Sequence, residues 1–307
     1  MPEWIREDGI GEWRMALIED DRIVEARILL DGIVAAGSKL LARLASGGRN
    51  AVARDDAGTE YLLPAGAPGI AEGGAFDMIV TRSAITGAEP WKRALARVAR
   101  PDDQPDDQVA AKPGTLPPAW DDLVEEARSG IVRFAGGELR ISPTPAMTLI
   151  DVDGQLDPAE LALAGAAEAA RAICRLDIGG SIGIDLPTVG SKAARNAAAA
   201  AIDAHLPQPF ERTAVNGFGF VQIVRPRRRA SLIELAQDRA AFEARALFRR
   251  VGFEPPGPKC LVAHPAVIAI LQTHSGWLEQ LARQIGGAVS LRAEPSVAMS
   301  GGYAEAA

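Results

Sequence analysis

Three aspartates in two short apolar runs are the residues of this chain best suited to chemistry. Asp151 and Asp153 end the run at 147–153, and Asp185 lies in the run at 181–186. Because alternate residues of a strand share a face, Asp151 and Asp153 point the same way. If the two runs are neighbours in one sheet, Asp185 comes within roughly 5 Å of Asp151, and both carboxylates can share a hard cation. Such a site suits phosphodiester hydrolysis.

Aspartate at a strand end also has a structural use, because it can cap a following helix or turn, and for Asp151 alone that explanation is equally good. Two features of the sequence favour a cation. Asp153 adds a second carboxylate to the face of Asp151, a repulsion that a cation or solvent must relieve. Ser181 and Gly183 leave the face around Asp185 almost bare, where a purely structural strand would fill it.

Basic residues form two patches that could contact phosphate, although the chain as a whole is acidic. The formal net charge of −7 disfavours generic high-affinity binding to nucleic acid, because that affinity comes from neutralising phosphates. The stronger patch follows a predicted strand, where it could contact a phosphate chain near the metal. It consists of Arg225, Arg227, Arg228 and Arg229, and the weaker patch consists of Lys92, Arg93, Arg97 and Arg100. Either patch could instead be a solvated surface.

The segment between the aspartate runs predicts a helix, and hence a β-helix-β unit with both carboxylates at corresponding ends. Asp157 suits the N-cap of a helix that extends to about Cys174, with Pro158 at its first position. A stripe of mostly small side chains that includes Leu163 would pack on the sheet, while Glu168 would face away.

The rest of the chain divides by composition and by the period of its apolar residues. Residues 12–30 predict a hairpin, and short strands at 39–44, 51–54, 60–63 and 76–83 are typical of a small barrel of the OB type. Residues rich in Pro and Asp predict a linker, and we expect a disordered end after Glu294. The expected fold is α+β, with N-terminal strands at 1–30, the barrel at 31–99, the linker at 100–117, an α/β domain at 118–250 and a small C-terminal α/β segment at 251–307.

Other chemistries have weaker support. Cys174 and Cys260 cannot build a disulfide framework, which favours a reducing cytoplasm, and neither has a partner at zinc spacing. The three histidines lack companions at triad or metal-ligand spacing, and no phosphate loop of the GxxxxGK type occurs. No stretch reaches the roughly 20 apolar residues of a membrane span, and the N-terminus lacks a signal-peptide pattern. We therefore expect a cytoplasmic protein without a membrane partner.

Several motifs, in their order and most of their spacings, resemble one family. They are Gly136-Gly137, the first aspartate run, Gly179-Gly180, the second aspartate run, and Phe218-Gly219 followed by Arg225 and Arg227. This succession resembles that of the ribonuclease E/G endoribonucleases, and the likeness covers nearly the whole chain. It implies an OB-type RNA-binding barrel and a DNase I-like or RNase H-like α/β catalytic domain built on a mixed sheet.

The resemblance also implies roles for residues. Asp151 and Asp185 would be the catalytic aspartates that bind magnesium, with manganese able to replace it, and Asp153 would assist them. The enzyme would cut single-stranded RNA to 5′-phosphate and 3′-hydroxyl ends, in RNA processing or decay. Tyr61 falls where the family's barrel carries an aromatic that stacks on RNA bases, and Lys92 falls near a basic contact. Arg225, Arg227, Arg228 and Arg229 would also bind RNA.

Departures from the family pattern modify these expectations. Ala51 replaces a second barrel aromatic, so the barrel should grip RNA weakly. The linker stands where the family has its sensor of 5′-monophosphate, so we expect no preference for 5′-monophosphorylated RNA. Only Cys260 of the family's zinc-binding cysteine pair is present, which predicts no structural zinc. A homo-oligomer stays open, but not one linked by zinc. Two other functions stay open: an RNA-binding protein of the same family that does not cleave, and a scaffold that binds proteins through its C-terminal segment.

Overall fold

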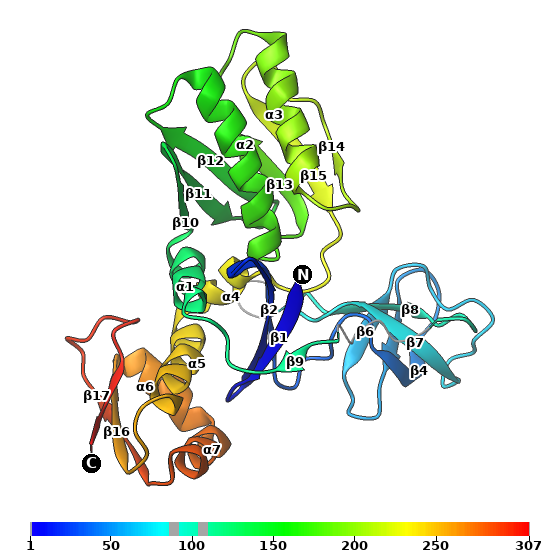
Figure 1. Ribbon diagram of the computed structural model, residues 1–307. Helices are drawn as coiled ribbons and strands as arrows, with labels where there is room; N and C mark the ends of the chain where they lie inside the picture. The colour runs from blue at the N-terminus through cyan, green and yellow to red at the C-terminus, as the bar shows by residue number, and fades with distance from the viewer. Residues whose placement is uncertain (1, 86–91, 104–109, 307) are drawn as a thin grey trace.

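The chain folds into four β-structures joined by helices, as seen in the computed structural model (Figure 1). The structure describes residues 2–85, 92–103 and 110–306. Within these residues lie a four-stranded sheet, a closed five-stranded barrel, a six-stranded mixed sheet, a three-stranded sheet and seven α-helices. The predicted α+β class is confirmed. None of the described helices has the length and apolar character needed to cross a membrane.

The four-stranded sheet lies at the centre of the molecule and has the order β3-β2-β1-β9 (Figure 1). Its strands are β1 (Glu3–Asp8), β2 (Glu12–Glu19), β3 (Arg22–Leu30) and β9 (Lys112–Pro113). Strands β2 and β3 form the predicted hairpin. Its turn residues Asp20 and Asp21 have φ angles of 47° and 60°, which aspartate tolerates and which match the twist of a hairpin.

Part of the predicted linker belongs to this sheet. Strand β9 pairs in parallel with β1, and Leu116 just after it is only 3% exposed. The linker prediction was therefore wrong for this stretch, because the backbone completes a sheet edge and one apolar side chain joins the core. The acidic part of the expected linker at 104–109 lies outside the described residues.

The barrel closes in the order β4-β5-β6-β8-β7, with β7 pairing back to β4. Its strands are β4 (Lys39–Ser46), β5 (Ala51–Arg54), β6 (Glu60–Leu63), β7 (Ala75–Arg82) and β8 (Ala94–Val98). The four predicted strands are present. The fifth, β8, pairs in parallel with β6 and antiparallel with β7, and so closes the barrel.

The six-stranded sheet has the order β10-β11-β12-β13-β15-β14 and carries two long helices. Its strands are β10 (Ile131–Phe134), β11 (Gly137–Pro143), β12 (Thr148–Gly154), β13 (Gly180–Asp185), β14 (Glu211–Arg212) and β15 (Phe220–Arg225). The helices are α2 (Pro158–Arg175) and α3 (Lys192–His205). As predicted, Asp157 caps α2, and its side chain accepts the Ala159 N–H.

The predicted stripe of α2 is buried for the most part, since Ala166, Ala170 and Ile173 lie in the core, but two positions differ from the prediction. Leu163 is 45% exposed, whereas Glu168 is only 9% exposed and pairs with Arg171 and Arg175. The helix approaches the sheet most closely at Gly165, where a Cβ would come 2.3 Å from Cγ1 of Val152. The prediction was therefore wrong for Leu163 and Glu168 only, because the alanine-rich sequence has small residues on more than one side of the helix.

The C-terminal unit is a three-stranded sheet with helices packed on it. Its elements are α5 (Arg239–Gly252), β16 (Lys259–Ala263), α6 (Pro265–Thr273), α7 (Ser275–Ile285), β17 (Val289–Ala293) and β18 (Tyr303–Ala306). The short helix α4 (Leu232–Gln237) precedes it and packs into the core of the mixed and central sheets. The expected disordered end was wrong, because β18 pairs antiparallel with β16. Leu247, Phe248 and Val251 of α5 belong to this core, which therefore begins upstream of the boundary expected at 251.

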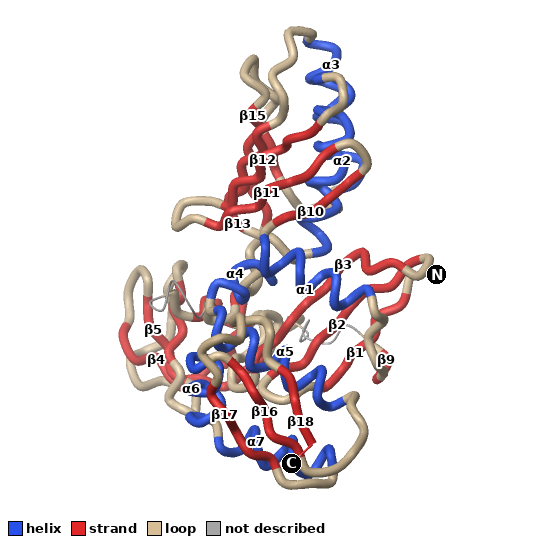
Figure 2. The backbone as a smooth tube through the Cα atoms, turned by 90° about the vertical axis from the view of Figure 1, so that its left-hand side faces the viewer, coloured by secondary structure: helices blue, strands red, loops and turns tan. Residues whose placement is uncertain are grey.

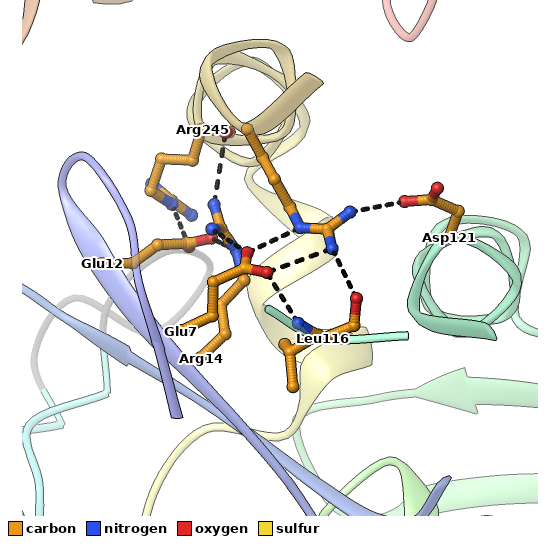
Figure 3. A network of polar contacts seen from close by, with 7 residues as sticks. Glu7, Glu12, Arg14, Leu116, Asp121 and Arg245 are labelled. Atoms are coloured by element: carbon orange, nitrogen blue, oxygen red, sulfur yellow. Dashed lines mark hydrogen bonds and ion pairs between the residues drawn. The ribbon is translucent and has the colours of Figure 1, made fainter. Parts of the chain in front are cut away.

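A network of charges that is buried between the central sheet and α5 extends to an exposed aspartate on α1 (Ala119–Ser129). Figure 3 labels Glu7, Glu12, Arg14, Leu116, Asp121 and Arg245. Arg249 of α5 joins the network through its ion pairs with Glu7 and Asp121. The Glu7 carboxylate accepts hydrogen bonds from Arg249 Nε at 2.7 Å and from the Leu116 N–H at 2.9 Å.

The surroundings of Glu7 lower its pKa. Burial alone would raise the pKa of this carboxyl, but the hydrogen bonds from Arg249 and Leu116 and the charges of Arg249 and Arg14 outweigh it. Glu7 is therefore held as a carboxylate that ties three distant parts of the chain together.

Candidate functional site

Asp151 and Asp185 are direct neighbours across two adjacent strands. Strands β12 and β13 pair in parallel, and the Cα register places Asp151 opposite Asp185. Neighbouring strands lie about 4.8 Å apart, so the two carboxylates share one end of the sheet. The predicted β-helix-β unit is therefore present, with its carboxylates at corresponding ends.

The pair faces away from the helices. Ile150 and Ile184 on the opposite side of the same strands are 1% and 0% exposed and belong to the core that includes α2. Asp151 and Asp185 are exposed. Figure 2 shows that α2 and α3 lie on one side of the six-stranded sheet only. A hydrated cation or a phosphate chain can therefore reach the carboxylates from solvent.

The face beside Asp185 is filled rather than bare. A Cβ built on Gly183 would come 2.6 Å from Cζ of Phe220 and 3.1 Å from Cδ2 of Leu149, so these two side chains lie over the glycine. Phe220 on β15 is also the register partner of Asp185. The expectation of open space was wrong, because the glycine makes room for a ring from the neighbouring strand.

Asp153 lies on the same face as Asp151, one strand repeat of about 6.8 Å further along. Its Oδ1 accepts the Gly154 N–H at 3.0 Å. Among the residues that the structure describes, no three His, Cys, Asp or Glu side chains form a group able to hold a metal. The expected set of three carboxylates is thus not gathered, and Asp151 with Asp185 remains as a pair.

Strand β11 adds an arginine that sequence reasoning missed. Arg140 is the register partner of Asp151, and Glu138 is the register partner of Asp153. Arg140 donates from Nε to Glu138 Oε1 at 3.0 Å, and its Nη2 lies 2.8 Å from the same oxygen. Its side chain is 60% exposed. The strand next to Asp151 therefore carries an arginine at the level of the carboxylate pair. The alternation of polar and apolar residues in this strand was the available signal.

The cluster at Arg225 lies at the wrong end of the sheet for the predicted contact. Strand β15 runs antiparallel to β13, which places Phe220 beside Asp185 and Arg225 beside Gly180. Five strand residues, or about 17 Å, separate these positions. The predicted approach of the arginines to the carboxylate pair was therefore wrong, because a strand that follows along the chain can run in either direction.

These arginines have structural partners near the central sheet. Arg225 donates to the Ile178 carbonyl at 3.1 Å, Arg227 pairs with Glu234, and Arg229 pairs with Asp177 at 2.7 Å. Burial raises the pKa of Asp177, and the charge and hydrogen bond of Arg229 oppose that rise. Arg228 is exposed, and its carbonyl accepts the Ser83 N–H.

Tyr61 lies inside the barrel and cannot serve as a stacking platform. Its side chain is 0% exposed, and its hydroxyl donates to Asp55 Oδ2 at 2.8 Å. Burial raises the pKa of Tyr61, and the bond to Asp55 raises it further. The expected role in stacking was wrong because β6 turns this ring inward.

Lys92 precedes β8 on the barrel and is half-buried, and its carbonyl accepts the Ile85 N–H at 3.1 Å. The barrel and the six-stranded sheet project from the central sheet in different directions (Figure 1). The structure therefore does not bring Lys92 together with Asp151 and Asp185.

Searches for similar proteins found no family model and no curated protein that matches this chain.

Proposed function

We propose that this protein is a reduced member of the ribonuclease E/G family and acts as a magnesium-dependent endoribonuclease on single-stranded RNA. The observation that carries the proposal is the parallel register of Asp151 and Asp185 on a solvent-exposed sheet face. Two neighbouring carboxylates repel each other, and the adjacent Arg140 is already paired with Glu138, so a bound metal ion would relieve the repulsion.

The donor set fits magnesium. Magnesium prefers oxygen ligands, keeps several waters and is commonly held by one or two carboxylates. Asp151 and Asp185 would hold it, Asp153 would assist from the next position on the strand, and manganese could replace it. When bound, the metal would polarise the scissile phosphate and lower the pKa of a coordinated water. The products would carry 5′-phosphate and 3′-hydroxyl ends.

Arg140 would bind a non-bridging oxygen of the scissile phosphate. Glu138 holds the guanidinium from one side, which orients the remaining N–H groups and limits the loss of side-chain entropy on binding. Arginine suits phosphate because its donors form a planar fork. In this proposal Arg140 takes the place near the reaction that the sequence suggested for the arginines at 225–229.

The finer fold assignment belongs to the same proposal. Five strands closed with a parallel β6–β8 pair support an OB-type barrel, and the mixed six-stranded sheet supports a DNase I-like or RNase H-like catalytic domain. Lys92 would contact RNA on the barrel. With Tyr61 buried, RNA affinity would depend less on the barrel than the family resemblance implies.

A metal-titrated cleavage assay tests the proposal. An unstructured RNA is incubated with purified protein and increasing magnesium or manganese, as matched substrates with 5′-monophosphate and 5′-hydroxyl ends. We expect internal cuts that require the metal, products with 5′-phosphates, and equal rates for the two substrates. Absence of metal-dependent cleavage would reject the proposed nuclease activity. Faster cleavage of the 5′-monophosphate substrate would reject the expectation that the protein has no sensor of 5′-monophosphate.

A non-cleaving RNA-binding protein of the same family is the second candidate. It is favoured because, in the described part of the chain, Asp153 does not come close enough to Asp151 and Asp185 to form a group of three metal-binding side chains. It predicts RNA binding that weakens steeply with salt, and no cleavage with any divalent ion.

A further inference from the structure

Phe218 is an aromatic side chain held in solvent. It is 81% exposed, more than any other large apolar residue in the described part of the chain. Large exposed apolar groups often mark binding sites, and aromatic rings are favoured because they offer a rigid contact surface. An exposed ring of this kind can mark a binding site if its backbone is held in place.

The backbone around Phe218 is fixed by hydrogen bonds. Asn216 Oδ1 accepts the N–H groups of Phe218 at 2.9 Å and of Phe220 at 3.1 Å, and Thr188 Oγ1 donates to the Phe218 carbonyl at 2.9 Å. Gly219 has a φ of 95°, and a Cβ there would come 2.1 Å from the Leu186 carbonyl oxygen. Glycine is thus required for this close approach, and the ring is presented on a turn that is tied down.

This turn adjoins the carboxylate pair. Leu186 and Thr188, which contact the turn, follow Asp185 directly along the chain, and Phe220 lies opposite Asp185 in the sheet. Phe220 and the 40% exposed Leu149 cover Gly183. An apolar surface with one projecting ring therefore lies next to the two carboxylates.

We propose that Phe218 is a base-stacking subsite, which holds the base of a nucleotide next to the scissile phosphate. The proposal rests on the proposed function, because the ligand is single-stranded RNA. A flat apolar surface beside a cation site and beside Arg140 matches a ligand in which flat bases alternate with phosphates. Stacking tolerates any base, so the subsite would position RNA without strong sequence preference.

The test measures RNA binding to the full chain by fluorescence anisotropy, in calcium, with RNA integrity checked on a gel. Two probes are compared: a short labelled oligoadenylate and the same oligomer built of abasic riboses. We expect Phe218→Ala to weaken oligoadenylate binding roughly 5- to 150-fold and to leave abasic binding unchanged. Phe218→Trp should retain binding. Phe253→Ala, which removes a ring that is 58% exposed on the C-terminal unit, should have no effect.

Other outcomes overturn the subsite. Unchanged oligoadenylate binding in Phe218→Ala, an equal loss for the abasic probe, or no RNA binding by the wild type would each reject it. A dimer of the wild type that dissociates in Phe218→Ala would show instead that the ring packs on a second copy of the chain. The cleavage assay separates this proposal from the proposed function. Base-dependent RNA binding without cleavage would support the subsite and reject the nuclease activity. Cleavage with no effect of Phe218→Ala on binding would support the nuclease activity and reject the subsite.

Discussion

Replacing Asp185 by asparagine should stabilise the protein without metal and destabilise it relative to the wild type when magnesium is present. Asp151 and Asp185 are opposite each other in the register of β12 and β13 and are both exposed. At a separation of about 5 Å in water, two like charges repel by about 1 kcal/mol, and salt screens part of this. Asp185→Asn removes the repulsion while keeping the size of the side chain.

Magnesium should reverse the order of stability of the wild type and Asp185→Asn. A ligand at ten times its dissociation constant stabilises the folded state by about 1.4 kcal/mol, and only the wild type should gain it. A change of 1 kcal/mol corresponds to a shift of about 2–4 °C in the melting temperature of a domain of this size. We therefore expect the variant to melt slightly above the wild type in EDTA and below it in saturating magnesium.

Calorimetry across a magnesium series measures this crossover. Asp31→Asn is the matched control, because Asp31 is an exposed aspartate in the turn after β3, outside the mixed sheet. It should keep the full magnesium-dependent rise. If magnesium raised the melting temperature of Asp185→Asn as much as that of the wild type, or did not raise that of the wild type, a magnesium site at this pair would be refuted.

Three further changes test other parts of the account. Glu7 has a lowered pKa, so its contribution to stability is present above its ordinary pKa of 4.5 and is lost as the pH falls further. Glu7→Gln should cost about 3 kcal/mol at neutral pH and flatten the dependence of the melting temperature on acid, and an unchanged acid profile would contradict this. Arg140→Gln should slow cleavage roughly 10- to 150-fold through loss of a charge-assisted bond, as measured by initial rates, whereas the exposed Arg22→Gln should not. Tyr61→Phe should lose about 1 kcal/mol of stability with its bond to Asp55 and leave RNA affinity unchanged in anisotropy, so that weaker RNA binding would argue against a buried ring.

Local patterns predicted much of the mixed sheet. The alternation around Asp151 and Asp185 and the cap at Asp157 depend on neighbours in sequence, and all three features are present. The direction of a strand does not depend on such neighbours. The antiparallel course of β15 therefore moved Arg225 away from the carboxylates and brought Phe220 to them.

Burial inside the barrel also escaped prediction. Tyr61 shares one face of β6 with Leu63, whereas Glu60 is on the other face, so the alternation of this short strand was a signal for an inward ring that the family resemblance overrode. The strand Tyr303–Ala306 was missed for a different reason, because a short polar segment becomes a strand only when an edge such as β16 is available. In this case the partner strand, rather than the segment itself, determines the structure.

The most direct test of the central claim is the initial rate of RNA cleavage in magnesium by Asp151→Asn and by Asp185→Asn. Both variants and Asp31→Asn are compared with the wild type on one unstructured RNA, after calorimetry has shown that each is folded. We predict that both site variants lose nearly all cleavage while Asp31→Asn cuts at the wild-type rate. Cleavage at the wild-type rate by either site variant would contradict a nuclease centre at this carboxylate pair.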